Sequence, residues 1–208
     1  MNELDAQNHL YDGWLYQRLI DPALSGIRRR IKKLVPPDAR VLDVGCGTGD
    51  QLVHLADKLS YGLGIELSEA MARTASRRLG RLNIEHCEVQ LADASKLENL
   101  TTASFDIATC SMMIHEMPES KRLPVLNEMT RLGKRIILVD WIYPPAALAK
   151  RWSTHIIEFM AGREHYAGYR SFMANGGIPA LLKATELNVI ETQITSKGTI
   201  QLWVCEIA

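Results

Sequence analysis

The sequence predicts a single α/β domain built on a mostly parallel β-sheet. Two observations support this class. Apolar strand-like segments alternate with helix-like segments from residue 40 to residue 141, as they do in chains of βαβ units. The last two strand-like segments are joined by a link too short for a parallel crossover, so they form a hairpin. The chain has 208 residues, a length that suits one domain with one core.

The alternating region contains five short strands rich in Val, Ile and Leu. Such runs are typical of parallel strands that are buried on both faces. The strands are expected at Arg40–Val44, Tyr61–Glu66, Ile84–Leu91, Phe105–Ser111 and Arg135–Trp141. The helices that follow the first four are expected at Asp50–Leu59, Ser68–Leu79, Ser95–Leu100 and Glu119–Arg131.

Three further segments flank or interrupt this alternation. Residues 1–35 are predicted to form a helical cap, which ends at Pro36 and Pro37 because proline cannot donate a hydrogen bond. Residues 143–187 form a mostly helical insertion with a break at Asn175-Gly176-Gly177. The terminal hairpin pairs Asn188–Thr195 with Thr199–Ile207, which makes the last strand antiparallel.

The charge balance predicts a protein that does not act on nucleic acid. Lys plus Arg and Asp plus Glu number 24 each, so the chain has no net field that would attract a polyanion. Residues 28–33 are the exception, with five basic side chains. We interpret them as a solvated helix face, with an anionic partner as the alternative.

The cysteines predict neither a metal site nor a redox motif. The four cysteines form no C-x-x-C pair and lie in apolar stretches, where a reduced cysteine behaves as a small hydrophobe. The polar start MNELDAQNHL is unlike a secretory signal, and no apolar run reaches the ~18 residues of a transmembrane helix. We therefore expect a cytoplasmic protein without a transmembrane segment.

A glycine-rich turn after the first strand is the most informative segment. In VLDVGCGTGD the strand is followed by Gly45, Gly47 and Gly49, and then by a helix. Glycine allows a sharp turn and close approach of a ligand to the backbone, and the helix start offers free N–H groups. The spacing G-x-G-x-G differs from the G-x-G-x-x-G of dinucleotide-binding proteins. The alternative is a glycine-rich turn that binds nothing.

Two acidic residues end the next two strands of the predicted sheet. Glu66 follows the glycine turn by about 20 residues and is placed to accept hydrogen bonds from a ribose diol. A helix-capping acid is the alternative for Glu66. Asp93 ends the third strand and can accept from an exocyclic amine such as that of adenine, although a simple turn residue is the alternative. Ligands of open α/β sheets bind at this carboxyl edge.

These segments carry a resemblance to a known family. VLDVGCGTGD, GLGIELSEAM, QLADASKL and FDIATCSMMIHEM resemble the successive motifs of class I S-adenosylmethionine-dependent methyltransferases. The nearest branch is the small-molecule one that includes ubiquinone and menaquinone biosynthesis methyltransferases. The resemblance covers residues 35–140 and implies S-adenosyl-L-methionine as cofactor. It also implies a Rossmann-like seven-stranded sheet of order 3-2-1-4-5-7-6.

The resemblance assigns cofactor roles to individual positions. It implies that the glycine turn and the preceding acid line the methionine part of the cofactor, that Glu66 holds the ribose, and that the next residues lie around the adenine. The implied cofactor-binding residues are Asp43, Gly45, Cys46, Gly47, Glu66, Leu67, Met71, Asp93, Ala94 and Ser111. The segment after Pro145 matches no acceptor-specific pattern.

The chemistry itself requires few protein groups. A sulfonium methyl is already activated, so the protein mainly aligns donor and acceptor, and a base helps only if the acceptor must lose a proton. His115 is the candidate base, because an unperturbed imidazole titrates near pH ~6.5. Packing within the loop is the alternative. Residues expected to contact the acceptor are Tyr11, Glu116, Tyr143, His165 and Tyr166.

We therefore expect a methyltransferase that transfers a methyl group to a small molecule by in-line displacement. The alternative is a non-catalytic module that binds S-adenosylmethionine or its demethylated product. A nicotinamide-dependent oxidoreductase is disfavoured by the glycine spacing and by Asp93. The position after the fourth strand reads Ser111-Met112-Met113-Ile114, without the Asn/Asp-Pro-Pro-aromatic motif of amino-methylating enzymes, which favours oxygen or carbon acceptors. A monomer or a homodimer is expected.

Overall fold

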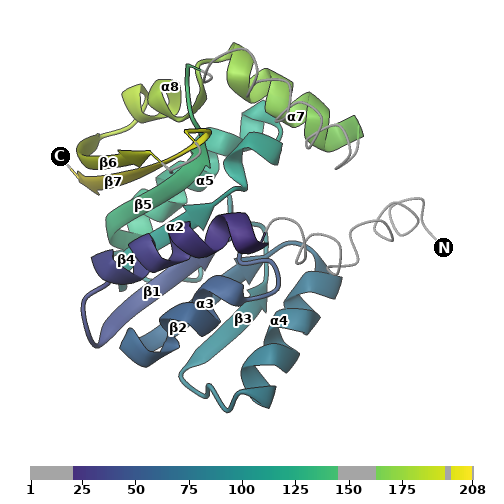
Figure 1. Cartoon of the computed structure of the whole chain (residues 1–208), viewed down its shortest axis with the longest axis vertical. Helices are drawn as coiled ribbons and strands as arrows, with labels where there is room; N and C mark the ends of the chain where they lie inside the picture. The colour runs from purple at the N-terminus through teal and green to yellow at the C-terminus, as the bar shows by residue number, and fades with distance from the viewer. Residues whose placement is uncertain (1–20, 145–162, 195–197, 208) are drawn as a thin grey trace.

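The computed structural model describes residues 21–144, 163–194 and 198–207, and its centre is one seven-stranded sheet. The strands are β1 (Ala39–Val44), β2 (Leu59–Glu66), β3 (Cys87–Leu91), β4 (Phe105–Ser111), β5 (Gly133–Trp141), β6 (Leu187–Ile194) and β7 (Ile200–Ile207). Their order is β3-β2-β1-β4-β5-β7-β6 (Figure 1). The first five strands are parallel and β7 runs antiparallel to both of its neighbours. The predicted fold and strand order are confirmed.

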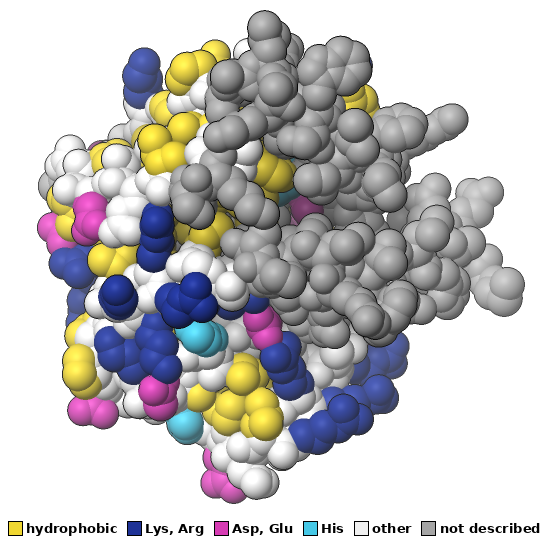
Figure 2. All heavy atoms as spheres, viewed as in Figure 1, with side chains coloured by type: hydrophobic (Ala, Val, Ile, Leu, Met, Phe, Trp, Pro, Cys, Tyr) yellow, Lys and Arg dark blue, Asp and Glu magenta, His cyan; other side chains and the backbone are white. Residues whose placement is uncertain are grey.

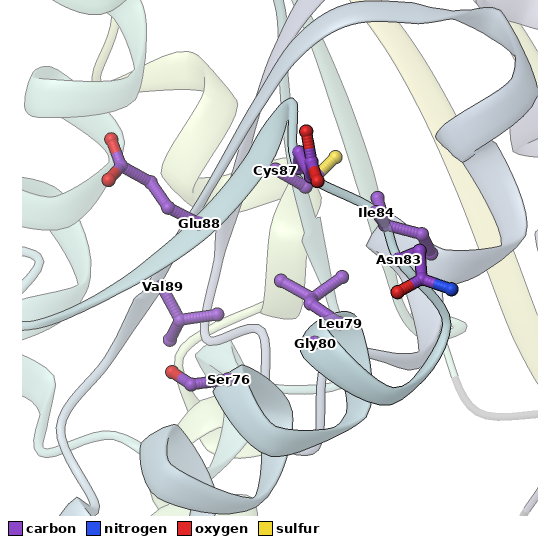
Figure 3. Close-up of a pocket in the computed structure, with 9 residues that line it drawn as sticks. Ser76, Leu79, Gly80, Asn83, Ile84, Cys87, Glu88 and Val89 are labelled. Carbon is purple, nitrogen blue, oxygen red and sulfur yellow. The ribbon is translucent and has the colours of Figure 1, made fainter.

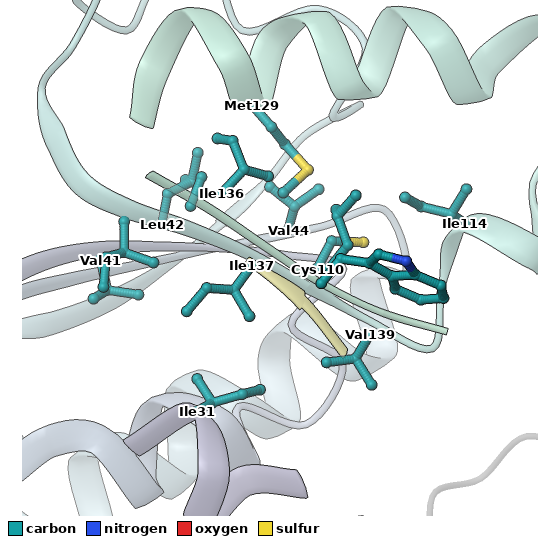
Figure 4. Close-up of a cluster of buried hydrophobic side chains, with 14 of the residues drawn as sticks. Ile31, Val41, Leu42, Val44, Cys110, Ile114, Met129, Ile136, Ile137 and Val139 are labelled. Atoms are coloured by element: carbon teal, nitrogen blue, oxygen red, sulfur yellow. The ribbon is translucent and has the colours of Figure 1, made fainter. Parts of the chain in front are cut away.

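Helices cover both faces of the sheet (Figure 1). They are α2 (Asp21–Leu34), α3 (Asp50–Leu55), α4 (Glu69–Arg81), α5 (Glu119–Leu132), α7 (Arg163–Ala174) and α8 (Gly177–Lys183), with single 3₁₀ turns η2 (Ala56–Lys58) and η3 (Ile114–Glu116). Ile31 of α2 and Met129 of α5 reach the central strands from opposite faces (Figure 4). Strands β1, β4 and β5 are buried on both faces, which explains their unbroken apolar sequences.

The described part of the N-terminal cap is α2, which ends before Pro36 as predicted. The Lys58 ammonium group caps it by donating to the carbonyl oxygens of Lys32 (2.9 Å) and Val35. The basic segment 28–33 is partly neutralised within the protein, because Arg28 pairs with Asp50 and Lys32 with a second aspartate. Figure 2 shows acidic side chains among the Lys and Arg groups on this face. The segment is therefore an ion-paired helix face and not an uncompensated basic patch.

One predicted helix is absent, and two predicted elements end or begin at other residues. The predicted helix at Ser95–Leu100 is a series of turns. Asp93 accepts from the N–H and hydroxyl groups of Ser95, and Arg131 of α5 donates to the carbonyls of Leu97 and Leu100, so these groups are satisfied without a helix.

The other two errors concern the ends of elements. The predicted helix Asp50–Leu59 stops at Leu55 and continues as η2, so β2 begins at Leu59. The strand predicted from Ile84 begins only at Cys87, because Asn83 takes a positive φ of 54° and the Ile84 N–H still bonds to the carbonyl of Leu79 in α4.

All four cysteines are buried and unpaired, as the sequence predicts. They are distributed over the sheet and its first loop: Cys46 follows β1, and Cys87, Cys110 and Cys205 lie in β3, β4 and β7. Burial raises the pKa of the Cys87 and Cys205 thiols to about 11. Within the described ranges, no group of His, Cys, Asp and Glu is arranged to hold a metal ion, and no helix is long and apolar enough to cross a bilayer.

Candidate functional site

The glycine turn leaves the carboxyl end of β1 and passes under the end of β2. Gly45, Gly47 and Gly49 have φ values of 70°, 54° and 74°, a region that favours glycine. The N–H groups of Gly45 and Cys46 both donate to the Ile65 carbonyl, which fixes the turn against β2. Among the described residues, only Met71 Sδ lies near a Cβ added to Gly47, at 4.0 Å, so these residues leave the space above Gly47 open toward α4. The turn can therefore admit a ligand next to its backbone.

Asp43 lies at the start of this turn with its carboxylate buried and half satisfied. The Thr109 hydroxyl donates to Oδ1 at 2.8 Å, whereas Oδ2 has no hydrogen-bond partner among the described residues. Burial is the main cause that raises the pKa of Asp43 to about 7, with the Thr109 hydrogen bond and Arg28 opposing it. A buried polar atom without a partner is uncommon. It marks a place that a ligand's donor group would satisfy.

Ser111, at the end of the neighbouring strand pair β4–β5, shows the same feature. Its Oγ is buried and has no hydrogen-bond partner within the described ranges. Because β1 and β4 are adjacent and parallel, with Asp43 beside Thr109, Ser111 ends its strand on the same edge of the sheet as the glycine turn. Two unpartnered polar groups therefore lie along one edge.

Glu66 connects the glycine turn to the start of α4. Its Oε2 accepts from the N–H of Gly47 at 2.9 Å, and its Oε1 accepts from the N–H of Ser68 at 2.8 Å. Ser68 in turn is the N-cap of α4 and accepts from the Met71 N–H. Glu66 thus binds the backbone at the start of α4, as the capping interpretation expects. Each carboxylate oxygen keeps a second lone pair, so both can accept from a ligand as well.

The residue after Glu66, at the carboxyl end of β2, is the exposed apolar residue Leu67. Leu67 is 73% exposed, the largest exposure among the large hydrophobic residues of the described part of the chain. Met71, one turn into α4, is half-buried beside Gly47. An apolar pair beside the glycine turn is suited to the flat face of a nucleobase.

Asp93 differs from its predicted environment, because its carboxylate is already bound. Oδ2 accepts from the Lys121 ammonium group at 2.9 Å, and Oδ1 accepts from the N–H and hydroxyl of Ser95. The Lys121 hydrogen bond is the main cause that lowers the pKa of Asp93 to about 2. Ala94 beside it is buried. Sequence reasoning missed Lys121, since no local motif places a residue of α5 against this loop.

The candidate base His115 is buried and fixed from several sides. Its Nδ1 lies 2.7 Å from Asp140 Oδ1, and its side chain is 2% exposed. Trp141, Tyr169 and Phe172 surround the ring in edge-to-face geometry, at centroid distances of 6.0, 6.4 and 6.3 Å. The ring is therefore packed within the loop, and its role as a base stays a prediction. The same geometry gives the ring a carboxylate partner, Asp140.

Helix α7 of the insertion packs directly on η3. A Cβ on Gly168 would lie 2.5 Å from the carbonyl oxygen of Glu116, so only glycine permits this approach. The Arg122 guanidinium, 2% exposed, joins the two by donating to the carbonyls of Met117 and Gly168. The insertion thus forms one wall of the region around His115.

The remaining predicted acceptor residues are only partly described. Tyr166 is half-buried on α7, and Tyr143 is 36% exposed after β5. The Cβ of Tyr143 lies 2.9 Å from the position of a Cβ on Gly177, so this ring is close to the start of α8. Tyr11 and the side chain of His165 lie outside the described residues.

The pocket between α4 and β3 contains none of these residues (Figure 3). It has a volume of about 370 Å³ and is lined by residues such as Leu79, Gly80, Asn83 and Cys87. It lies away from the carboxyl edge where the glycine turn and the two unpartnered polar groups meet. We therefore assign the candidate site to that edge and not to this pocket.

The strand order and the helices on both faces of the sheet make the fold Rossmann-like. A methyltransferase domain family matches residues 41–135. Among solved structures, an S-adenosylmethionine-dependent methyltransferase from Aquifex aeolicus superposes with a TM-score of 0.66 at 18% identity, covering 95% of this chain and 100% of the other. The chain is thus similar in sequence and in fold to class I S-adenosylmethionine-dependent methyltransferases.

Curated relatives are similar over part of their length. The demethylmenaquinone methyltransferase of Clavibacter sepedonicus is 30% identical over 113 residues, which are 54% of this chain and 45% of that protein. The 27-O-demethylrifamycin SV methyltransferase of Amycolatopsis mediterranei is 28% identical over 134 residues, 61% of this chain and 48% of that protein. The aligned part of the chain thus spans less than half the length of these relatives.

Proposed function

We propose that the protein is an S-adenosylmethionine-dependent methyltransferase that acts on a small molecule. The observation that carries the proposal is the pair of buried, unpartnered groups, Asp43 Oδ2 and Ser111 Oγ, beside a glycine turn with open space. The methionine part of the cofactor ends in an ammonium group, which is a strong donor for a buried carboxylate. The residues present therefore fit the cofactor.

Each part of the cofactor has a matching set of residues. The methionine end would lie along Asp43, Gly45, Cys46 and Gly47, with Ser111 near the methyl group. Glu66 would accept from the ribose hydroxyls with its remaining lone pairs while it keeps the glycine turn in place. The adenine would lie against Leu67 and Met71, with Ala94 and the backbone beside Asp93 at its edge. Lys121 already neutralises Asp93, so we assign Asp93 the role of holding this loop.

The cofactor supplies an activated methyl group, and the protein aligns it with the acceptor. Exclusion of water and fixed geometry supply most of the acceleration in such a displacement. Proteins of similar fold differ in their acceptors: solved structures with TM-scores of 0.65 and 0.61 are a geranyl diphosphate C-methyltransferase and a magnesium protoporphyrin IX methyltransferase. We propose that residues 143–187, with the N-terminal cap of residues 1–35, form the acceptor pocket, including Tyr11, Tyr143, His165 and Tyr166.

Calorimetry of the full chain with S-adenosylmethionine and with S-adenosylhomocysteine tests the cofactor assignment. We expect both to bind at micromolar concentration. Gly47→Val should abolish binding, because a branched side chain fills the open space and strains a positive φ. Gly80→Val serves as the matched control, because it substitutes a glycine whose Cβ would also meet open space but on the far end of α4. Equal binding by Gly47→Val would refute the placement of the cofactor.

A second candidate is a module that binds the cofactor without transferring its methyl group. The tight aromatic packing around His115 favours it, because a filled wall leaves less room for an acceptor. Labelled methyl donor separates the two functions when it is incubated with a library of hydroxyl, carbon and amine acceptors. An enzyme releases S-adenosylhomocysteine in step with a methylated product, whereas a binding module releases neither.

The cellular compartment, the exclusion of nucleic acid as acceptor and the oligomeric state are three further proposals. Four buried, unpaired cysteines are typical of a reducing compartment, so we propose a cytoplasmic protein. The balanced charge and the ion-paired face of α2 support an acceptor other than nucleic acid. We propose a monomer or a homodimer.

A further inference from the structure

The pocket between α4 and β3 lies at the edge of the sheet, away from the candidate cofactor site (Figure 3). β3 is the first strand in the sheet order, and within the described ranges it pairs only with β2. The pocket has a volume of about 370 Å³, and Leu79 of α4 and Val89 of β3 supply apolar lining. An apolar hollow beside a free strand edge is a place where a second protein surface can pack.

Gly80, in the last turn of α4, helps to form this hollow. A Cβ added to Gly80 would meet no atom of the described residues within 4 Å. Glycine destabilises a helix relative to alanine. Neither packing within the described part of the chain nor a positive φ requires glycine at this position. The bare backbone instead leaves room for the close approach of a group from outside the chain.

An exposed apolar side chain lies next to the hollow. Leu82 directly follows α4, is 51% exposed, and precedes Asn83, which lines the pocket. A single exposed leucine is common on protein surfaces. Here, however, an apolar side chain and an apolar hollow occupy the same face. In a two-fold symmetric dimer each copy supplies both partners of every contact, so such a face is complementary to itself.

The rims of the pocket carry opposite charges. Arg77 lies three residues before Gly80 and therefore on the same side of α4, and Glu85 lines the pocket from the loop before β3. Both residues are exposed, and neither forms an ion pair within the described ranges. Glu88, by contrast, accepts from the Tyr61 hydroxyl group and points away from the pocket (Figure 3). The first two charges are thus available to a partner.

These two charges distinguish between kinds of partner. A strongly acidic surface would meet Glu85 and a strongly basic surface would meet Arg77, so either surface would be repelled at one rim of the pocket. A second copy of the chain, related by a two-fold axis, brings Arg77 of each copy to Glu85 of the other. Both ion pairs then form together with the apolar contact. A second copy thus satisfies both rims at once.

We propose that the C-terminal half of α4, residues 82–86 and β3 form the interface of a homodimer. Leu82 of each copy enters the pocket of the other, and Arg77 pairs with Glu85 across the two-fold axis. The interface goes beyond the proposed methyltransferase function and does not depend on it. Met71, beside the glycine turn, lies at the opposite end of α4, so both candidate cofactor sites stay open in the dimer.

Sedimentation equilibrium of the full chain measures the dimer and its charge pairs. We expect a monomer–dimer equilibrium at protein concentrations of about 100 µM or less, as for a small interface. Arg77→Glu and Glu85→Lys should each raise the dissociation constant about tenfold or more, because each places like charges at two symmetric contacts. An equal mixture of the two variants should dimerise again, since every contact then joins opposite charges. Arg29→Glu, at an exposed position of α2, is the matched control and should change nothing.

Two further variants test the hollow. Gly80→Val fills it and Leu82→Ser removes the side chain that enters it, so each should weaken the dimer about tenfold or more while circular dichroism shows an intact fold. A parent that stays monomeric at about 100 µM, or a dimer that none of the four variants weakens, would overturn the interface. If a monomeric parent binds anilinonaphthalene sulfonate and Gly80→Val does not, the pocket takes a small apolar molecule and the dimer is wrong. Failure of the mixed variants to dimerise refutes the two-fold pairing of Arg77 with Glu85.

Discussion

Substituting Asp43 by asparagine should remove a pH dependence from the stability of the fold. Burial raises the pKa of this carboxyl group from 3.8 to about 7. The native state therefore holds a proton on Asp43 that the unfolded state has already released between these two values. Stability falls as pH rises through this window, and this contribution becomes constant only above about pH 8. Asparagine carries no such proton, so the variant lacks this contribution.

The magnitude follows from the two pKa values. From pH 5 to pH 8, the titration of Asp43 lowers the free energy of unfolding of the parent by about 2.5 kcal/mol. The new amide hydrogens face the unpartnered side of the residue and cost about 1–3 kcal/mol, but that cost is the same at every pH. The quantity to compare is thus the change with pH in the difference between variant and parent.

Denaturant unfolding followed by circular dichroism at several pH values measures this difference. We expect Asp43→Asn to gain about 2.5 kcal/mol on the parent between pH 5 and pH 8. Thr109→Val provides a second check: it removes the hydroxyl that donates to Oδ1 and should raise the pKa of Asp43 further. If the difference in free energy of unfolding between variant and parent is the same from pH 5 to pH 8, Asp43 titrates normally. Burial then does not raise its pKa.

Three further perturbations test the site. Glu66→Gln should weaken S-adenosylmethionine binding by about 1.5 kcal/mol or more in calorimetry, because hydrogen bonds to a charged acceptor are lost; equal affinity would leave Glu66 as a capping residue only. Gly168→Ala should lower thermal stability by about 2 kcal/mol, since its Cβ meets the Glu116 carbonyl at 2.5 Å; an unchanged melting temperature contradicts the close approach. Lys121→Met should raise the pKa of Asp93 from about 2 toward 3.8, so the stability that this carboxylate contributes would be lost at higher pH during acidification. Carboxyl ¹³C titration measures that pKa, and no change would exclude Lys121 as its cause.

The sequence predicted the fold because its signals were local and mutually consistent. Apolar runs of six to nine residues became the buried strands β1, β2, β4 and β5, and the short link after β6 required the antiparallel β7. The failed prediction at Ser95–Leu100 has a non-local cause, because Arg131 and Glu128 of α5 satisfy the backbone of that loop. No pattern within the loop itself could indicate those partners.

The candidate site likewise combines residues that local spacing predicts with partners that are distant in sequence. The glycine turn and Glu66 were found from spacing along the chain, and the structure brings them into hydrogen-bond contact. The partners Asp140 and Lys121 were not assigned to His115 and Asp93, because each pair lies more than 20 residues apart in sequence. Such pairs depend on which strand ends are neighbours in the sheet, and this is known only once the strand order is known.

Because the buried cysteines lie in different strands, their rates of chemical modification report local unfolding of the sheet. A thiol reacts as the thiolate, so burial and a raised pKa protect Cys87 in the edge strand and Cys205 in β7 from alkylating agents in the native state. Cys110, in the centre of the sheet, is protected still more strongly. Modification rates followed by mass spectrometry would therefore separate fraying of the β3 edge from global unfolding, without an added label. Slower modification at every cysteine upon addition of a nucleoside ligand would measure how far its binding energy spreads through the sheet.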